Sequence, residues 1–127
     1  MLPISERTLA LTQGAWWLVT GTWPILDLRS FERITGPKRE GWLVKTVGAL
    51  VAVIGAGLLI AGLRRRPIAP EVKVIAAGAA CALGAVDLIY PLKKQIPPVY
   101  LADVLPELGW AIGWVLTSRP PPVQPAD

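Results

Sequence analysis

The chain has 127 residues, of which 53% are hydrophobic and 17% are charged, and its formal net charge is +4. Soluble domains average roughly 45–50% apolar and about 25% charged residues, so this composition favours a membrane protein. Histidine is absent and Cys81 is the single cysteine, which excludes histidine-based metal or acid–base chemistry and an internal disulfide. The basic residues stand in short groups between apolar blocks, so the positive charge does not indicate a nucleic-acid partner.

Four apolar blocks are long enough to cross a bilayer, whose hydrocarbon core takes roughly 20 helical residues. An open sheet would leave unpaired edges in lipid and four segments are too few to close a barrel, so each block is predicted to be a helix. We therefore predict an all-α integral membrane bundle of four transmembrane helices in a domain of residues 1–118, followed by a proline-rich disordered tail at 119–127. The predicted spans cover residues 9–28, 42–63, 72–92 and 99–117.

The predicted spans place both termini on one side of the membrane. Basic residues are divided equally between the two sides, and the compact cluster of Arg64, Arg65 and Arg66 favours cytoplasmic termini. Asp27 and Asp87 each precede a leucine at the end of a span and are followed by a basic connection, which suggests two helical hairpins in parallel arrangement. The six tryptophans are expected at the membrane–water interface, where an indole ring is buried and its N–H is hydrated.

Small residues recur on single faces of the predicted helices, because positions seven apart share a face. The second block has a glycine at every seventh position, and the third and fourth blocks carry shorter patterns of the same kind. No hydrophobic effect drives helices together in lipid, so such residues typically mark close backbone contacts, either within the bundle or with another protein. The predicted helix-packing residues are Gly48, Gly55, Gly62, Ala80, Gly84, Gly109 and Gly113.

Ionisable residues form a second pattern near the membrane face opposite the termini, where the first and third spans end and the second and fourth begin. This candidate polar cluster comprises Asp27, Lys45, Asp87, Asp103 and Glu107. One interpretation is that they are interfacial residues stabilised by helix dipoles and by Lys45. The other is an acidic vestibule for a cation or proton, since charges in a bilayer normally face water or a partner. Asp87 lies at a helix C-terminal end, where the dipole disfavours an acid, so we predict that it contacts a cation, with Lys45 or a neighbouring basic residue as the partner.

The stretch from Gly36-Pro37-Lys38 through residues 42–48 resembles a feature of small uncharacterised bacterial membrane proteins with four predicted spans. The resemblance covers about a fifth of the chain, implies the bacterial cytoplasmic (inner) membrane as the location, and brings no activity with it.

The sequence contains no catalytic, cofactor-binding or metal-ligand motif, so no cofactor is expected. The first hypothesis is a non-enzymatic accessory or scaffold subunit that packs in the lipid bilayer within a larger membrane complex or a homo-oligomer. The alternative is a small proton- or cation-coupled transporter or channel that uses the polar cluster. An enzyme of lipid metabolism ranks third, because acids and a lysine are present without a nucleophile motif.

Overall fold

The computed structural model describes residues 5–36, 40–64 and 66–117, whose regular structure is entirely α-helical. The predicted all-α class is therefore confirmed, and the long helices begin and end within a few residues of the predicted blocks. The predicted tail at 119–127, and Pro37, Lys38 and Arg65 of the predicted connections, lie outside the described residues. The helices are α1 (Glu6–Leu26), α2 (Leu28–Thr35), α3 (Gly41–Leu63), α4 (Pro70–Leu92) and α5 (Tyr100–Thr117).

Two of the described helices, α3 and α4, are long and apolar enough to cross a membrane. The predicted spans 9–28 and 99–117 correspond to α1 and α5, which do not meet the same criterion. Their polar content is the reason: α1 contains Gln13 and several threonines, and α5 contains Asp103 and Glu107. The structure thus establishes a helical protein with two candidate spans, and it does not by itself establish four.

The first predicted span is interrupted before its end. Ser5 begins α1, its hydroxyl oxygen accepting a hydrogen bond from the Thr8 N–H at 3.1 Å. Asp27 has non-helical φ and ψ of −151° and 81°, and its carboxylate accepts a bond from the Ser30 N–H that caps α2. Trp23 then donates to the Ser30 hydroxyl at 2.7 Å, which holds α2 against the end of α1. The chain therefore turns at Asp27 instead of continuing the helix to residue 28.

The backbones of α1 and α3 touch through glycines, which leave no side chain between the helices. A Cβ on Gly55 would lie 2.6 Å from the Leu18 nitrogen, and one on Gly48 would lie 2.5 Å from the Gly21 carbonyl oxygen. Gly14 and Gly21 of α1 are equally confined by α3. The heptad-spaced glycines of α3 thus pack within this chain, against a matching pair of α1 glycines.

The other predicted packing residues differ among themselves. Ala80 is buried in a core cluster with Trp17 and Ala111. A Cβ on Gly113 would meet the Leu9 side chain at 2.7 Å, whereas one on Gly84 would make an ordinary 3.4 Å contact with Glu107. A Cβ on Gly109 would meet no described atom within 4 Å, so Gly109 faces outward. Gly62, unlike Gly109, packs inside the chain, against Leu11.

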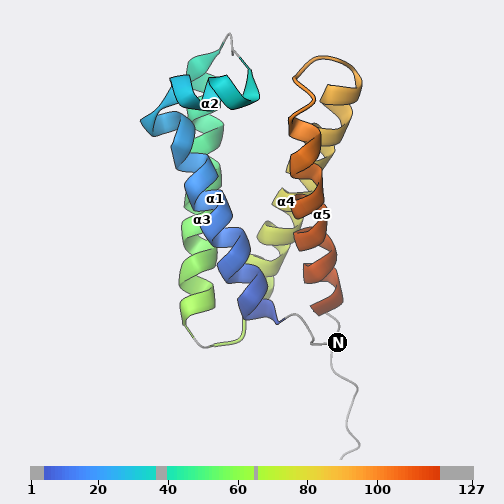
Figure 1. The fold of residues 1–127 in the computed structure, drawn as a ribbon. Helices are drawn as coiled ribbons and strands as arrows, with labels where there is room; N and C mark the ends of the chain where they lie inside the picture. The colour runs from blue at the N-terminus through green and yellow to red at the C-terminus, as the bar shows by residue number, and fades with distance from the viewer. Residues whose placement is uncertain (1–4, 37–39, 65, 118–127) are drawn as a thin grey trace, which may run out of the picture.

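The fold consists of two antiparallel helix pairs placed side by side, the α1–α3 pair and the α4–α5 pair (Figure 1). Contacts within each pair are extensive, and contacts between the pairs are few. The pairs lie close together at the end where α1 begins, and they separate toward the end where α2 lies (Figure 1). This divergence positions the candidate site.

Candidate functional site

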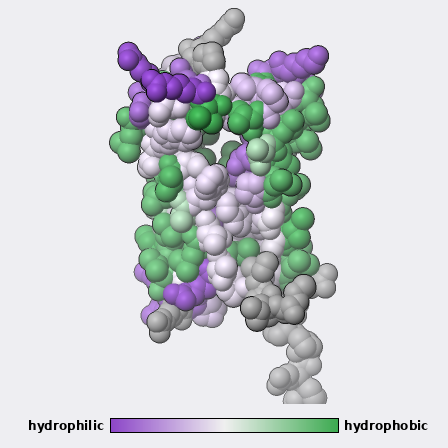
Figure 2. Space-filling view, viewed as in Figure 1, coloured by the Kyte–Doolittle hydropathy of each residue, from purple (hydrophilic) through white to green (hydrophobic). Residues whose placement is uncertain are grey.

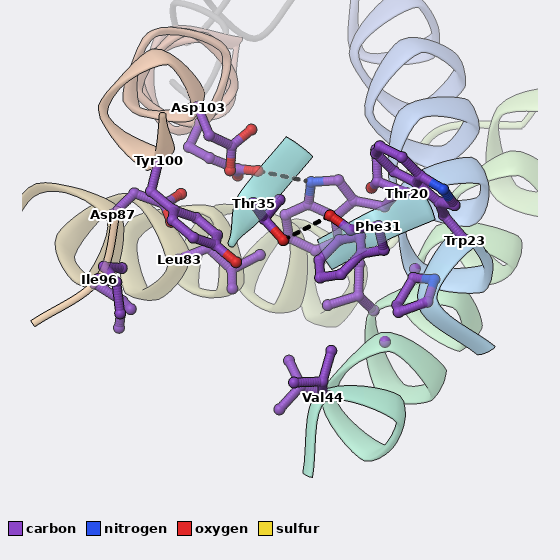
Figure 3. Close-up of a pocket in the computed structure, with 18 of the residues that line it drawn as sticks. Thr20, Trp23, Phe31, Thr35, Val44, Leu83, Asp87, Ile96, Tyr100 and Asp103 are labelled. Atoms are coloured by element: carbon purple, nitrogen blue, oxygen red, sulfur yellow. Dashed lines mark hydrogen bonds between the residues drawn. The ribbon is translucent and has the colours of Figure 1, made fainter. Parts of the chain in front are cut away.

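A cavity of about 540 Å³ lies between the two helix pairs, and we call it the inter-pair cavity. Most of its wall is aliphatic or aromatic, with side chains from α1, α2, α3, α4 and α5. The surface is hollowed between the pairs in Figure 2 at this level, and Figure 3 gives the close view. Three carboxylic acids line it, Asp87, Asp103 and Glu107, here called the carboxyl cluster. None of the described residues that line the cavity is Lys or Arg.

Glu107 is the most deeply buried member of the carboxyl cluster, with only 1% of its surface exposed. Its Oε1 accepts a hydrogen bond from the indole Nε1–H of Trp17 at 3.0 Å. Its Oε2 is buried and has no hydrogen-bond partner within the described part of the chain. An unsatisfied carboxylate oxygen in an apolar place is costly, so this atom calls for a partner that the described residues do not supply.

Asp87 and Asp103 meet across the α4–α5 pair. Asp87 is buried and Asp103 is half-buried, and both line the cavity. Figure 3 draws both at the same wall of the cavity. Ionised carboxylates only accept hydrogen bonds, so two such groups can be bridged only by a proton or another cation. With Glu107 nearby on the same α5 face, the cluster concentrates negative charge against an apolar space.

The other two residues of the predicted polar cluster lie elsewhere. Asp27 is exposed and caps α2, as its position just beyond the end of α1 dictates. Lys45 is exposed on α3 and does not line the cavity, and no ion pair joins it to an acid within the described ranges. Its long aliphatic stem lets the ammonium group reach solvent. The expected Lys45–Asp87 contact is therefore not present, and Asp87 faces another acid.

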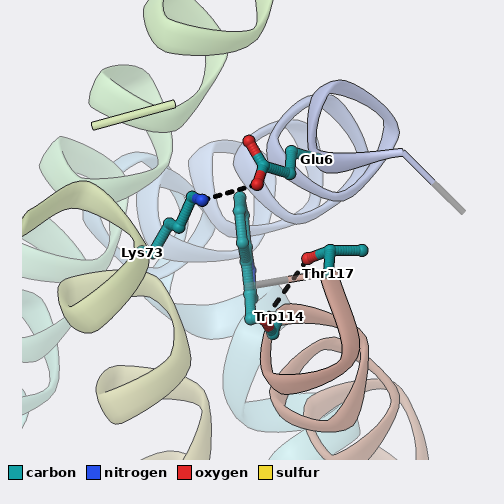
Figure 4. A network of polar contacts seen from close by, with 4 residues as sticks. All are labelled: Glu6, Lys73, Trp114 and Thr117. Atoms are coloured by element: carbon teal, nitrogen blue, oxygen red, sulfur yellow. Dashed lines mark hydrogen bonds and ion pairs between the residues drawn. The ribbon is translucent and has the colours of Figure 1, made fainter. Parts of the chain in front are cut away.

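The opposite end of the bundle is tied together by polar contacts. Gln13 is fully buried, donates its amide N–H to the Ala76 carbonyl oxygen at 3.0 Å, and accepts from the Trp114 indole at 2.7 Å. Nearby, Lys73 forms an ion pair with Glu6, and Trp114 lies beside them (Figure 4). These contacts join α1 to α4 and α5. They hold the two helix pairs together at the end of the bundle away from the cavity.

The interfacial role expected for the tryptophans is wrong for Trp17 and Trp114, each only 1% exposed. Each indole N–H is satisfied inside the bundle by a side-chain oxygen, of Glu107 and Gln13 respectively. Trp16 and Trp42 are exposed, as expected of interfacial residues. The signal for Trp17 was present in its spacing: it lies four residues after Gln13 and so shares its helix face.

Within the described residues, no three His, Cys, Asp or Glu side chains are grouped so that they would hold a metal ion, and no metal site is assigned. The arrangement instead offers acidic oxygens on one wall of an apolar chamber. Its chemical capacity is to hold positive charge. Comparisons with protein-family models, with curated proteins and with solved structures give no match to this chain, so its function is inferred from its own residues.

Proposed function

We propose that α1, α3, α4 and α5 all cross the membrane and that the inter-pair cavity binds a cation or proton during transport across it. Burial supports the first part. Only 28% of the most apolar stretch of α3 and 22% of that of α4 is buried inside the protein, whereas the core helix of a soluble protein would be mostly buried. Large aliphatic side chains more than half exposed occur on all four helices, such as Val19, Leu50, Val74 and Leu105. Lipid is the medium that suits such a surface.

The polar groups of α1 and α5 are compatible with a span. Gln13 and Glu107 are turned inward, and Thr12, Thr20 and Thr22 of α1 donate to backbone carbonyls one turn earlier, as Thr20 does to Trp16 at 2.8 Å. Hydrophilic residues gather at the two ends of the bundle, and hydrophobic residues cover its two flanks between them (Figure 2). The basic residues divide equally between the two ends, and we assign the end that carries Arg64 and Arg66 to the cytoplasm of a bacterial cell because its arginines form the more compact cluster.

The transport proposal rests on one observation, the buried Oε2 of Glu107, which has no hydrogen-bond partner among the described residues, in a cavity lined by three carboxyl groups and by no described Lys or Arg. Ionisable residues at membrane depth are costly and normally mark an ion or substrate pathway. A structural role would pair these acids with a base, as Lys73 pairs with Glu6. The carboxyl cluster has no such base among the residues described, so its charge is balanced by what enters the cavity.

Flux into vesicles tests this proposal. The full chain is reconstituted into vesicles of phosphatidylethanolamine and phosphatidylglycerol, and uptake of H⁺, Na⁺, K⁺ and an organic ammonium tracer is followed. We expect at least one cation to enter faster than in protein-free vesicles, and Glu107→Gln to abolish the excess. Glu71→Gln is the matched control, since Glu71 is exposed in the first turn of α4, outside the cavity. If no cation enters faster with the parent protein, the transport proposal is wrong.

The accessory or scaffold subunit predicted from the sequence is the second candidate function. The observation that favours it is the set of small residues on outer faces: a Cβ on Gly57, Gly78 or Gly109 would meet no described atom within 4 Å. Purification from the native membrane in mild detergent separates the candidates. A stoichiometric complex with a second protein, disrupted by Gly109→Leu, supports the subunit; this chain alone, with cation flux, supports the transporter.

A further inference from the structure

The walls of the inter-pair cavity indicate which class of cation it would take. A small inorganic cation is held by several close oxygen ligands that replace its hydration shell. This cavity presents carboxyl oxygens on one wall only, and its remaining surface comes mainly from side chains such as Val47, Val51, Leu83 and Val86. A hydrated ion would leave this apolar surface facing water. A ligand with a hydrocarbon body would cover it.

Aromatic side chains add to this preference. Trp17, Trp23, Phe31 and Tyr100 line the cavity, and Trp23 and Phe31 meet edge to face with ring centroids 5.2 Å apart. Aromatic rings attract organic ammonium groups, which carry their charge in a weakly hydrated apolar shell. The cavity volume, about 540 Å³, lies within the range of roughly 300–1,000 Å³ typical of sites for small organic molecules.

The charged end of such a ligand has a defined place. Glu107 Oε2 is buried without a hydrogen-bond partner among the described residues, at the wall that Asp87 and Asp103 also line. With the Glu107 carboxyl group turned toward the cavity, an ammonium or guanidinium group at this wall would satisfy that oxygen and reduce the repulsion among the three acids. The hollow between the helix pairs in Figure 2 lies along the side of the bundle, so an amphipathic molecule would reach it from the bilayer.

We propose that the inter-pair cavity binds an organic monocation with an apolar body, its charge against the carboxyl cluster and its body along the aliphatic and aromatic walls. This inference rests on the proposed transport function and names its substrate class. It goes beyond that function because a proton or an inorganic cation would satisfy the transport proposal equally well.

Binding to a charged probe and its neutral isostere tests the inference. The purified full chain is titrated in detergent with benzylammonium, whose N–H groups can donate to Glu107, and, separately, with ethylbenzene, which has the same heavy-atom shape and no charge. Tryptophan fluorescence reports binding, because Trp17 and Trp23 line the cavity. We expect saturable binding of the ammonium, binding of the neutral isostere weaker by about tenfold or more, and no competition by equal concentrations of Na⁺ or K⁺.

Variants connect the binding to the cavity. Glu107→Gln keeps an oxygen that can accept from Trp17 and should weaken ammonium binding by about tenfold or more, while Glu71→Gln leaves it unchanged. If Glu107→Gln does not fold, the half-buried Asp103→Asn takes its place, with a weaker effect in the same direction. Equal binding of both probes would overturn the inference. So would an ammonium affinity that is the same in the parent protein, in Glu107→Gln and in Asp103→Asn.

The two proposals fail differently. If Na⁺, K⁺ or H⁺ enters vesicles through the protein and the ammonium neither binds nor enters, the substrate class is wrong and the transport function stands. If no cation enters and the ammonium does not bind, both proposals are wrong.

Discussion

Trp114 of α5 donates its indole N–H to the side-chain oxygen of Gln13 of α1 over 2.7 Å, and both side chains are buried. The Gln13 amide nitrogen continues the connection to the Ala76 carbonyl oxygen of α4 at 3.0 Å. One side chain thus links three helices at the point where the two pairs are closest. Because buried polar groups are expensive to leave unpaired, the contact holds the pairs in one register.

We expect Gln13→Leu to lower the free energy of unfolding by roughly 1–3 kcal/mol, because the Trp114 N–H would stay buried without an acceptor. Reversible denaturant titration in mixed micelles measures this difference. Thr12→Val is the control: Thr12 accepts a bond from Trp110 at an exposed position, and its loss should cost less than about 0.5 kcal/mol. If both variants lost the same free energy of unfolding, burial of the Gln13 contact would add nothing to the stability that it contributes.

Gly55→Ala should destabilise the protein by roughly 1–3 kcal/mol, because its Cβ would overlap backbone atoms of α1 that have no room to move. Gly57→Ala, two residues further along the same helix, adds its Cβ to open space and should be neutral or slightly stabilising through helix propensity. The same titration compares the two. Two indistinguishable alanine variants would mean that α1 and α3 are not in backbone contact.

Four spans predict a definite labelling pattern for single cysteines in a Cys81→Ala background. Arg33→Cys and Gln95→Cys, exposed near the two connections at the α2 end, should react with a membrane-impermeant maleimide from one side. Arg66→Cys, exposed in the connection between α3 and α4, should react only from the other side. Intact and permeabilised vesicles distinguish the sides. Reaction of all three cysteines from one side would refute the four-span arrangement.

Lys45→Gln should change the free energy of unfolding by less than about 0.5 kcal/mol, because Lys45 is exposed and has no ion pair within the described ranges. Combined with Asp87→Asn, its effect should be additive within about 0.5 kcal/mol. A larger coupling energy in this double-mutant cycle would support the Lys45–Asp87 pairing, which the sequence predicted and the structure does not show.

The helices were predictable because prolines and charged groups interrupt apolar blocks of helical length. The meeting of Asp87, Asp103 and Glu107 was also predictable, because chain order alone brings the ends of successive antiparallel helices to one level. Sequence spacing did not identify the outward direction of Lys45. An almost uniformly apolar helix has no polar face to orient it, and only the glycines of α3 mark the side that packs.

Two further features depended on contacts distant in sequence. Gly14 and Gly21 are seven residues apart, as the glycines of α3 are, but only the partner helix reveals that the two sets interlock. The spacing of Trp17 from Gln13 indicates its inward face, but its hydrogen-bond partner Glu107 lies ninety residues away in the chain. The turn at Asp27 was predictable from the local sequence, because Asp is a common helix N-cap, whose carboxylate accepts from the N–H of the residue three positions later, here Ser30.

The glycine contact between α1 and α3 also bears on how such a chain can evolve. Where two backbones touch, each position accepts glycine and little else, so selection for folding alone would keep residues 14, 21, 48 and 55 fixed. The opposite wall borders open space, and substitutions at Leu83, Val86 or Tyr100 would reshape the chamber without disturbing that contact. A fold divided in this way separates the residues that preserve its architecture from those that shape its cavity, so the cavity can change by substitution while the backbone stays the same.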